Sequence, residues 1–260
     1  MMNKMITSAI VTAAASLLVA CAAQAKPQPL DPNTFVAPTR SVSSYILLDR
    51  TGSMSDIWSE ALGSVNAYAN AVGTAEDGEA DDLETKVTLA AFDFHEAFQF
   101  DVLRRDIKAQ DWQVVRDDEV SPRGMTPLFD AISRTISLAE ADNPEKAVIV
   151  IMTDGQENAS REMTREGARA ALDRAEARGW EVVFLGAEFA NFDDADGVGV
   201  AQTKQMAVSA EALSATQERL ARKARDYGKG EADEIIFEAE DREVAGEEEV
   251  RDRTGSGRTR

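Results

Sequence analysis

The most constraining feature of this sequence is the run of apolar and β-branched residues at 147–153 (AVIVIMT). Such a run is typical of a strand buried on both faces, as in the centre of a parallel sheet. Residues 42–49 and 180–185 form similar runs. Segments with apolar residues at helical spacing separate these strands, at 54–72, 128–139 and 164–178. The alternation predicts one α/β domain, with a doubly wound, mostly parallel sheet and helices on both faces.

The remaining elements fit the same plan. Residues 86–94 and 97–102 predict two strands that are close enough along the chain to form a hairpin. Residues 205–208 predict a short edge strand, and residues 209–227 predict a last helix. We therefore expect a single folded domain over residues 42–228.

The first 25 residues have the pattern of a secretory signal, in which a positive start precedes a short, alanine-rich apolar run. Two processing routes stay open. One is cleavage after the Ala-Gln-Ala sequence at 23–25, and the other is a bacterial lipobox at 18–21 (LVAC), which makes Cys21 an acylated first residue. Four prolines in residues 26–41 predict an extended tether. We expect an exported protein, in the periplasm, on the outer membrane as a lipoprotein, or secreted.

The net charge of −19 limits the partners of this chain. Nucleic acids and anionic membranes need basic surfaces, so we expect no nucleic acid partner, and membrane contact only through a lipid on Cys21. Residues 229–260 are rich in acidic side chains and predict an acidic, disordered tail. With Cys21 and His95 as the only cysteine and histidine, zinc sites built from these residue types are excluded. Any metal must therefore bind to oxygen.

Three short segments carry oxygen-bearing side chains at the end of a predicted strand or the start of a predicted helix. They contain Asp49, Thr51 and Ser53 in the first segment, Thr126 in the second and Asp154 in the third. The carboxyl ends of parallel strands lie on one edge of a sheet, where ligands bind at the point of strand-order reversal, so these segments can converge. Two carboxylates balance the charge of Mg²⁺, and hydroxyls add hard oxygen ligands without repulsion.

Together, the sequences DRTGS at 49–53, TPL at 126–128 and TDG at 153–155 resemble the metal-ion-dependent adhesion site of von Willebrand factor A-type (vWA) domains. The resemblance covers roughly residues 43–208. It implies a Rossmann-like, six-stranded sheet in which one short strand is antiparallel. Thr51 stands where this family usually has a serine, and it keeps the hydroxyl.

By the same resemblance, Thr51, Ser53 and Thr126 would bind the metal directly, and Asp49 and Asp154 would act directly or through water. The implied metal is Mg²⁺, with Mn²⁺ or Ca²⁺ as alternatives. A carboxylate from a protein partner or another ligand would complete the metal shell. Because the family consists chiefly of binding modules, the resemblance implies an adhesion or assembly module at the cell envelope rather than an enzyme.

Two other functions stay open. The DRTGS sequence also resembles the Asp-Lys-Thr-Gly-Thr segment of P-type ATPases, so a haloacid-dehalogenase-like phosphotransferase would use Asp49 as its nucleophile with Mg²⁺. No glycine precedes Asp154, however, and the Thr126 segment has no role in such an enzyme. The second alternative is a structural envelope protein with an idle metal site. Taken singly, Ser53 or Ser55 could cap a helix and Asp154 could lie in a turn.

Overall fold

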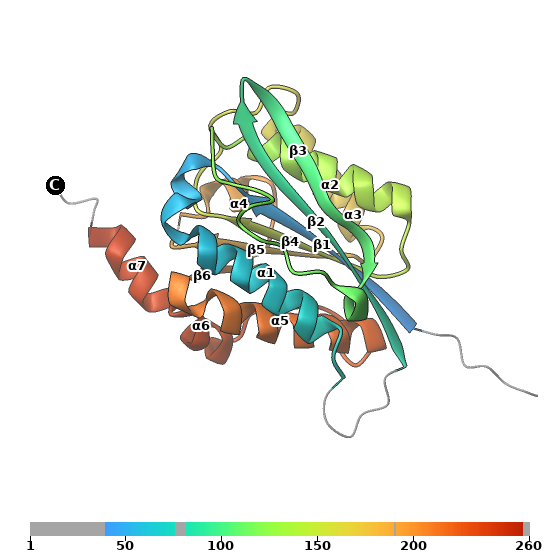
Figure 1. Cartoon of the computed structure of the whole chain (residues 1–260). Coiled ribbons are helices and arrows are strands. Elements are labelled where there is room, and N and C mark those ends of the chain that lie inside the picture. Colours follow the sequence, from blue (N-terminus) through green and yellow to red (C-terminus); the bar gives the residue numbers. More distant parts are fainter. Residues whose placement is uncertain (1–39, 76–81, 190, 257–260) are drawn as a thin grey trace, which may run out of the picture. The chain divides into compact units, whose positions relative to one another are not determined.

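The computed structural model describes residues 40–75, 82–189 and 191–256. The predicted signal peptide, the lipidation site at Cys21 and the tether up to residue 39 lie outside these residues. Six strands form one sheet: β1 (Arg40–Asp49), β2 (Leu83–His95), β3 (Ala97–Lys108), β4 (Ala147–Thr153), β5 (Glu181–Ala187) and β6 (Gln205–Val208). Their order is β3-β2-β1-β4-β5-β6, and only β3 runs antiparallel to its neighbour (Figure 1). The predicted six-stranded, mostly parallel sheet is confirmed, but the antiparallel strand β3 has 12 residues and is not short as expected.

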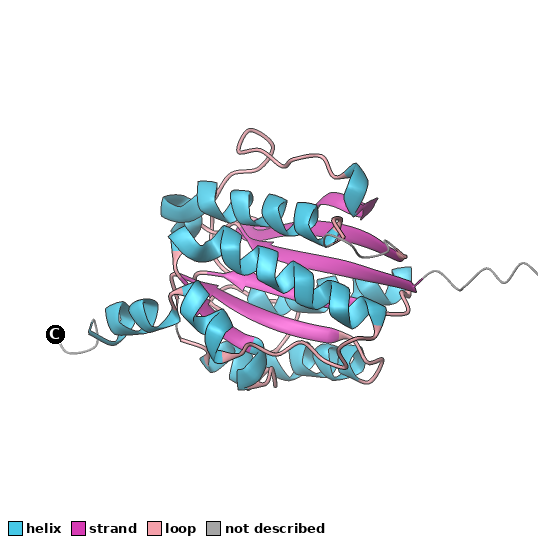
Figure 2. Ribbon diagram, turned by 90° about the horizontal axis from the view of Figure 1, so that it is seen from below, coloured by secondary structure: helices cyan, strands magenta, loops and turns pink. Residues whose placement is uncertain are grey.

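Helices cover both faces of the sheet (Figure 1). The α-helices are α1 (Trp58–Val72), α2 (Leu128–Asp142), α3 (Arg165–Glu176), α4 (Asp193–Gly197), α5 (Leu213–Lys229), α6 (Ala239–Ala245) and α7 (Glu247–Ser256). Figure 2 views the face on which α1 and α5 lie across the strands, while α2 and α3 cover the other face. None of the helices in the described part of the chain has an apolar stretch that would span a lipid bilayer.

Side chains along the central strand alternate between the two faces of the sheet. Val148, Val150 and Met152 of β4 pack with α1 and α5, whereas Ile149 and Ile151 pack with α2 and α3. This is the period of two that a strand imposes on its side chains. Because helices cover both faces, both sets of side chains are apolar, which is why this strand appears as an unbroken apolar run in the sequence.

The predicted disordered tail is wrong for residues 229–256. Residue 229 still belongs to α5, and the chain continues through α6 and α7. Ile235 and Phe237 are only 1% and 5% exposed, and they join the core on the α5 side of the sheet. The acidic composition led to a prediction of disorder, because it outweighs these few apolar side chains in the sequence. Their burial stabilises the segment. The folded domain therefore extends well beyond residue 228.

The C-terminal segment covers the edge strand β6. The backbone N–H of Ser209 donates to the carbonyl of Ala245 at 2.9 Å, and that of Ala207 donates to the carboxylate of Glu247 at 3.1 Å. Burial alone would raise the pKa of Glu247, but hydrogen bonds from Arg242 and Ala207 lower it below its ordinary value. The segment therefore pairs polar groups that an open sheet edge would leave exposed to other chains.

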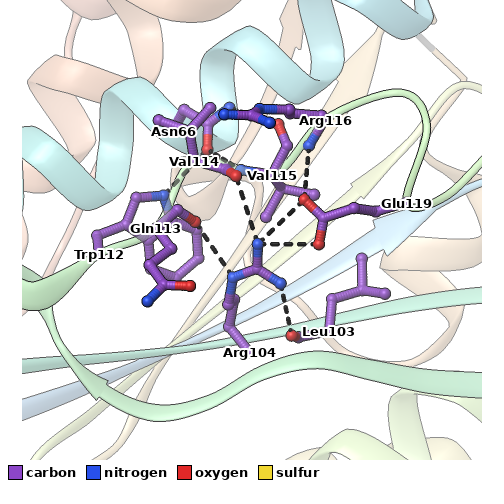
Figure 3. A network of polar contacts seen from close by, with 9 residues as sticks. All are labelled: Asn66, Leu103, Arg104, Trp112, Gln113, Val114, Val115, Arg116 and Glu119. Atoms are coloured by element: carbon purple, nitrogen blue, oxygen red, sulfur yellow. Dashed lines mark hydrogen bonds and ion pairs between the residues drawn. The ribbon is translucent and has the colours of Figure 1, made fainter.

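A long segment connects β3 to α2, and we call residues 112–126 of it the strap. Arg104 of β3 donates to the carbonyls of Gln113 and Val114 in the strap (Figure 3). Asn66 of α1 exchanges two hydrogen bonds with the backbone of Val115, at 2.9 and 3.0 Å (Figure 3). These side chains hold the first residues of an irregular segment against regular elements.

Candidate metal centre

The site lies at the carboxyl ends of β1 and β4, where the order of the strands reverses. Leu48 pairs with Met152 in the parallel register, so the next residues, Asp49 and Thr153, lie side by side. The hydroxyl of Thr153 donates to Oδ2 of Asp49 at 2.6 Å. Ligands of open α/β sheets bind at this kind of switch point.

Asp49 is fully buried, and both of its carboxylate oxygens accept hydrogen bonds. Its Oδ1 accepts from the backbone N–H of Thr51 at 2.7 Å. Burial raises the pKa of Asp49 to about 7, although the hydrogen bonds from Thr153 and Thr51 oppose the rise. Burial also raises the pKa of Asp154, opposed by a hydrogen bond from Ser53. A nearby divalent cation would favour the ionised form of both carboxyls.

Three hydroxyls and one carboxylate meet beside Asp49. The hydroxyl of Ser53 donates to Oδ1 of Asp154 at 2.8 Å and lies 3.2 Å from the hydroxyl of Thr51. The hydroxyl of Thr126 lies 3.4 Å from that of Thr51. The structure thus brings together all five side chains that the sequence analysis selected, from segments as far apart as residues 53 and 154.

These oxygen separations allow a test of whether the donor set fits a cation. Octahedral ligands at about 2.0–2.1 Å from Mg²⁺ have neighbouring oxygens about 2.9 Å apart. The separations of 2.8, 3.2 and 3.4 Å lie close to that spacing. In the described residues no three His, Cys, Asp or Glu side chains gather to hold a metal, so a cation here would depend on hydroxyl ligands. The residues present therefore fit a small divalent cation with an incomplete protein shell.

A glycine turn sets the position of Thr126. Gly124 has φ +72°, and a Cβ at this residue would lie 2.3 Å from the carbonyl oxygen of Phe94. This close approach allows Phe94 and Met125 to exchange two backbone hydrogen bonds, at 2.9 and 3.1 Å. The backbone of Gly52 also donates to the carbonyl of Gly124 at 3.2 Å. The turn thus joins the loop after β1 to the end of β2, and only glycine fits there without strain.

The residues that follow Asp154 hold the Thr126 loop from the other side. The backbone of Thr126 donates to Oδ1 of Asn158 at 2.9 Å, and the backbone of Asn158 donates to the carbonyl of Thr126 at 3.0 Å. The carboxylate of Glu157 accepts from the first turn of α2 at Phe129 and from the backbone of Ser160. Glu157 and Asn158 therefore organise the site, a role that the sequence analysis did not assign to them.

The helix-capping explanation of the first motif does not describe the structure. The short 3₁₀ helix Gly52–Ile57 and α1 begin after Thr51 and Ile57, and neither residue forms a side-chain capping bond. Ser55 donates to the carbonyl of Gly52 at 2.7 Å, whereas Ser53 points its hydroxyl at Asp154.

Asp130 organises a loop. Its carboxylate accepts hydrogen bonds from the backbone of Arg161, Glu162 and Met163 at 2.6–3.0 Å. This arrangement fixes the segment that leads into α3 and uses both oxygens of the Asp130 carboxylate.

Sequence comparisons give no match to a protein-family model or to a curated protein. The structure is similar to the pilus adhesin SpaC from Lactobacillus rhamnosus GG, with a TM-score of 0.56 and 14% identity over 72% of this chain and 30% of that chain. It is also similar to the vWF domain of the type V pili tip protein Mfa5 from Porphyromonas gingivalis, with a TM-score of 0.52 and 11% identity over 73% of this chain and 96% of that chain. This chain thus corresponds to less than a third of SpaC and to almost the whole Mfa5 domain. Identities at this level show a shared fold, and the described residues of this chain have a fold of the vWA type.

Proposed function

We propose that this chain is a divalent-metal-dependent binding module that captures a protein ligand through a carboxylate. Thr51, Ser53 and Thr126 would bind Mg²⁺ through their hydroxyls, and Asp49 and Asp154 would act directly or through water. The observation that carries the proposal is the meeting of oxygens of Thr51, Ser53, Thr126 and Asp154 from three separate loops at the switch point of the sheet, with neighbouring oxygens 2.8–3.4 Å apart. The cation would supply a coordination position for an oxygen of the ligand.

The surface beside the site supports a protein ligand. Met125, next to Thr126, is 48% exposed and offers an apolar contact beside the site. Arg161 stacks over the ring of Phe94, with its guanidinium carbon 4.3 Å from the ring centroid, and the side chain of Arg123 is 43% exposed. These arginines place positive charge near the site of a protein whose net charge is −19. A ligand that combines a carboxylate with an apolar neighbour suits this surface.

The proposed setting is the cell envelope. The signal-like N-terminus predicts export, with a lipid on Cys21 or cleavage after residue 25 as the two routes. SpaC is a pilus adhesin and Mfa5 is a pili tip protein, and both carry a domain of this fold. Their occurrence at the cell surface supports a role for this chain in adhesion or assembly there.

We propose binding rather than catalysis. A phosphotransferase would need Asp49 as an exposed nucleophile, but its side chain is fully buried and both oxygens accept hydrogen bonds. The remaining alternative is a structural protein with an idle metal site. It predicts that an added carboxylate leaves the affinity for the metal unchanged, whereas the binding module predicts a higher affinity.

The test is a titration of the chain from residue 26 to residue 260 with Mn²⁺, followed by electron paramagnetic resonance. We expect one bound ion in the wild type and its loss in Thr126→Ala and Asp154→Ala. Thr135→Ala is the matched control, because it removes a buried threonine hydroxyl from the middle of α2. Acetate should tighten Mn²⁺ binding if an open position accepts a carboxylate, since the two affinities are reciprocally coupled. Metal binding without this coupling would favour the idle site, and no metal binding would refute the proposal.

A further inference from the structure

A buried charge network lies beside the candidate metal centre. Asp93 of β2 is fully buried, and its Oδ2 accepts hydrogen bonds from Nε of Arg50 and, at 3.2 Å, from Nε of Arg123. Arg50 is itself only 4% exposed, and its Nη2 donates to Asp101 of β3 at 2.6 Å. A single carboxylate thus joins two arginines that are far apart in the sequence.

Each arginine belongs to a loop that carries a proposed metal ligand. Arg50 lies between Asp49 and Thr51, and Arg123 lies three residues before Thr126. The backbones of the two loops are also joined, because the N–H of Arg123 donates to the carbonyl of Arg50 at 2.7 Å. A shift of either arginine therefore changes the distance between the hydroxyls of Thr51 and Thr126.

Stability alone does not account for this network. Burial of charged groups carries a desolvation cost that a buried ion pair often fails to recover relative to apolar side chains of similar size. The second oxygen of Asp93, Oδ1, is buried without a hydrogen-bond partner within the described part of the chain. An unpaired buried oxygen adds to the cost, so the arrangement calls for a further explanation.

We propose that Asp93 is a positioning residue of the metal centre, which acts through Arg50 and Arg123 to hold two hydroxyl-bearing loops at the distance that a cation requires. We call this set of three residues the clamp. The inference rests on the proposed metal binding and extends it to a carboxylate that does not touch the ion. Side chains that orient metal ligands typically change metal affinity about 10- to 100-fold when they are mutated.

The experiment compares the dissociation constant for Mn²⁺ in the wild-type chain from residue 26 to residue 260 and in three variants of it. Asp93→Asn removes the negative charge of the clamp while keeping the shape of that side chain, and Arg123→Ala removes the clamp arginine that is partly exposed. Glu181→Gln is the matched control, because it disrupts a buried pair with Lys204, 2.8 Å long, at the start of β5 on the opposite edge of the sheet. Far-UV circular dichroism and urea denaturation in EDTA report the fold and stability of each metal-free variant.

We expect Asp93→Asn to weaken Mn²⁺ binding about 10- to 100-fold, Arg123→Ala to weaken it less, and Glu181→Gln to lose stability at unchanged affinity. Adding Arg123→Ala to Asp93→Asn should have little further effect on affinity, because both act through one contact. If Asp93→Asn does not fold, the Mn²⁺ affinity of Arg123→Ala alone tests the proposal. Wild-type affinity in the folded clamp variants would overturn the clamp and leave the proposed function standing. A wild type that binds no Mn²⁺ would overturn both.

Discussion

Substitution of Gly124 by alanine should damage both stability and the metal centre. The backbone of Gly124 has φ +72°, and this conformation costs an alanine roughly 1–2 kcal/mol. The added Cβ would also lie 2.3 Å from the carbonyl oxygen of Phe94, which is backbone and yields only if the loop moves. Overpacking of this kind costs about 1–3 kcal/mol. We therefore expect Gly124→Ala to lower the free energy of unfolding by about 2–5 kcal/mol.

Gly179→Ala separates the two contributions. Gly179 has φ +76°, but a Cβ there would meet no atom within 4 Å, so only the conformational cost of roughly 1–2 kcal/mol remains. Urea denaturation in EDTA measures both variants without the metal. Mn²⁺ affinity should fall in Gly124→Ala, because the displaced carbonyl of Phe94 accepts from the backbone of Met125, next to Thr126. Equal destabilisation by the two substitutions, with unchanged Mn²⁺ affinity in both, would refute the argument from close contact.

Three further predictions concern the metal, the C-terminal segment and its pH dependence. Mg²⁺ at 100 times its dissociation constant should raise the melting temperature by about 5–11 °C over EDTA, and Asp154→Ala should abolish the rise in differential scanning fluorimetry. Phe237→Ala should cost about 3–5 kcal/mol in urea denaturation, because the ring is buried, and no effect would mean that the tail does not pack. The lowered pKa of Glu247 adds stability that is present above its unfolded value of about 4.5 and is lost as pH falls through the folded value. Glu247→Gln should therefore flatten the loss of stability on acidification, measured as urea midpoints from pH 6 to pH 3, and an unchanged slope would contradict this linkage.

The sheet could be predicted because its strands are buried in ways that leave patterns in the sequence. β4 is covered on both faces and appears as a continuous apolar run. Asp49 marks the end of β1, and Thr153 and Asp154 mark the end of β4. The edge strand β3 was harder to delimit. It extends to Lys108, six residues beyond the predicted end, because its exposed side chains carry the charges typical of a loop.

The clamp could not be predicted for a related physical reason. Arg50, Asp93 and Arg123 are charged, and charged residues without a spatial context are expected in solvent. Only the three-dimensional arrangement shows that two guanidinium groups share one buried carboxylate. The prediction of a disordered C-terminal segment was wrong because acidic side chains outnumber apolar ones there. The few buried apolar residues, such as Ile235, decide whether the segment packs.

The proposed ligand set would explain how a strongly acidic protein could bind a carboxylate. Asp49 and Asp154 would balance the charge of one divalent cation, and the hydroxyls of Thr51, Ser53 and Thr126 would add no charge. A third carboxylate in the shell would leave the centre negative, and the anionic ligand would then be repelled. With hydroxyls in these positions, the proposed set would hold only the two carboxylates needed for neutrality, and the long-range repulsion from a net charge of −19 is screened over about 8–10 Å at physiological salt. Attraction at the cation can therefore exceed repulsion by the rest of the molecule, provided that the ligand approaches from the face that carries Arg123 and Arg161.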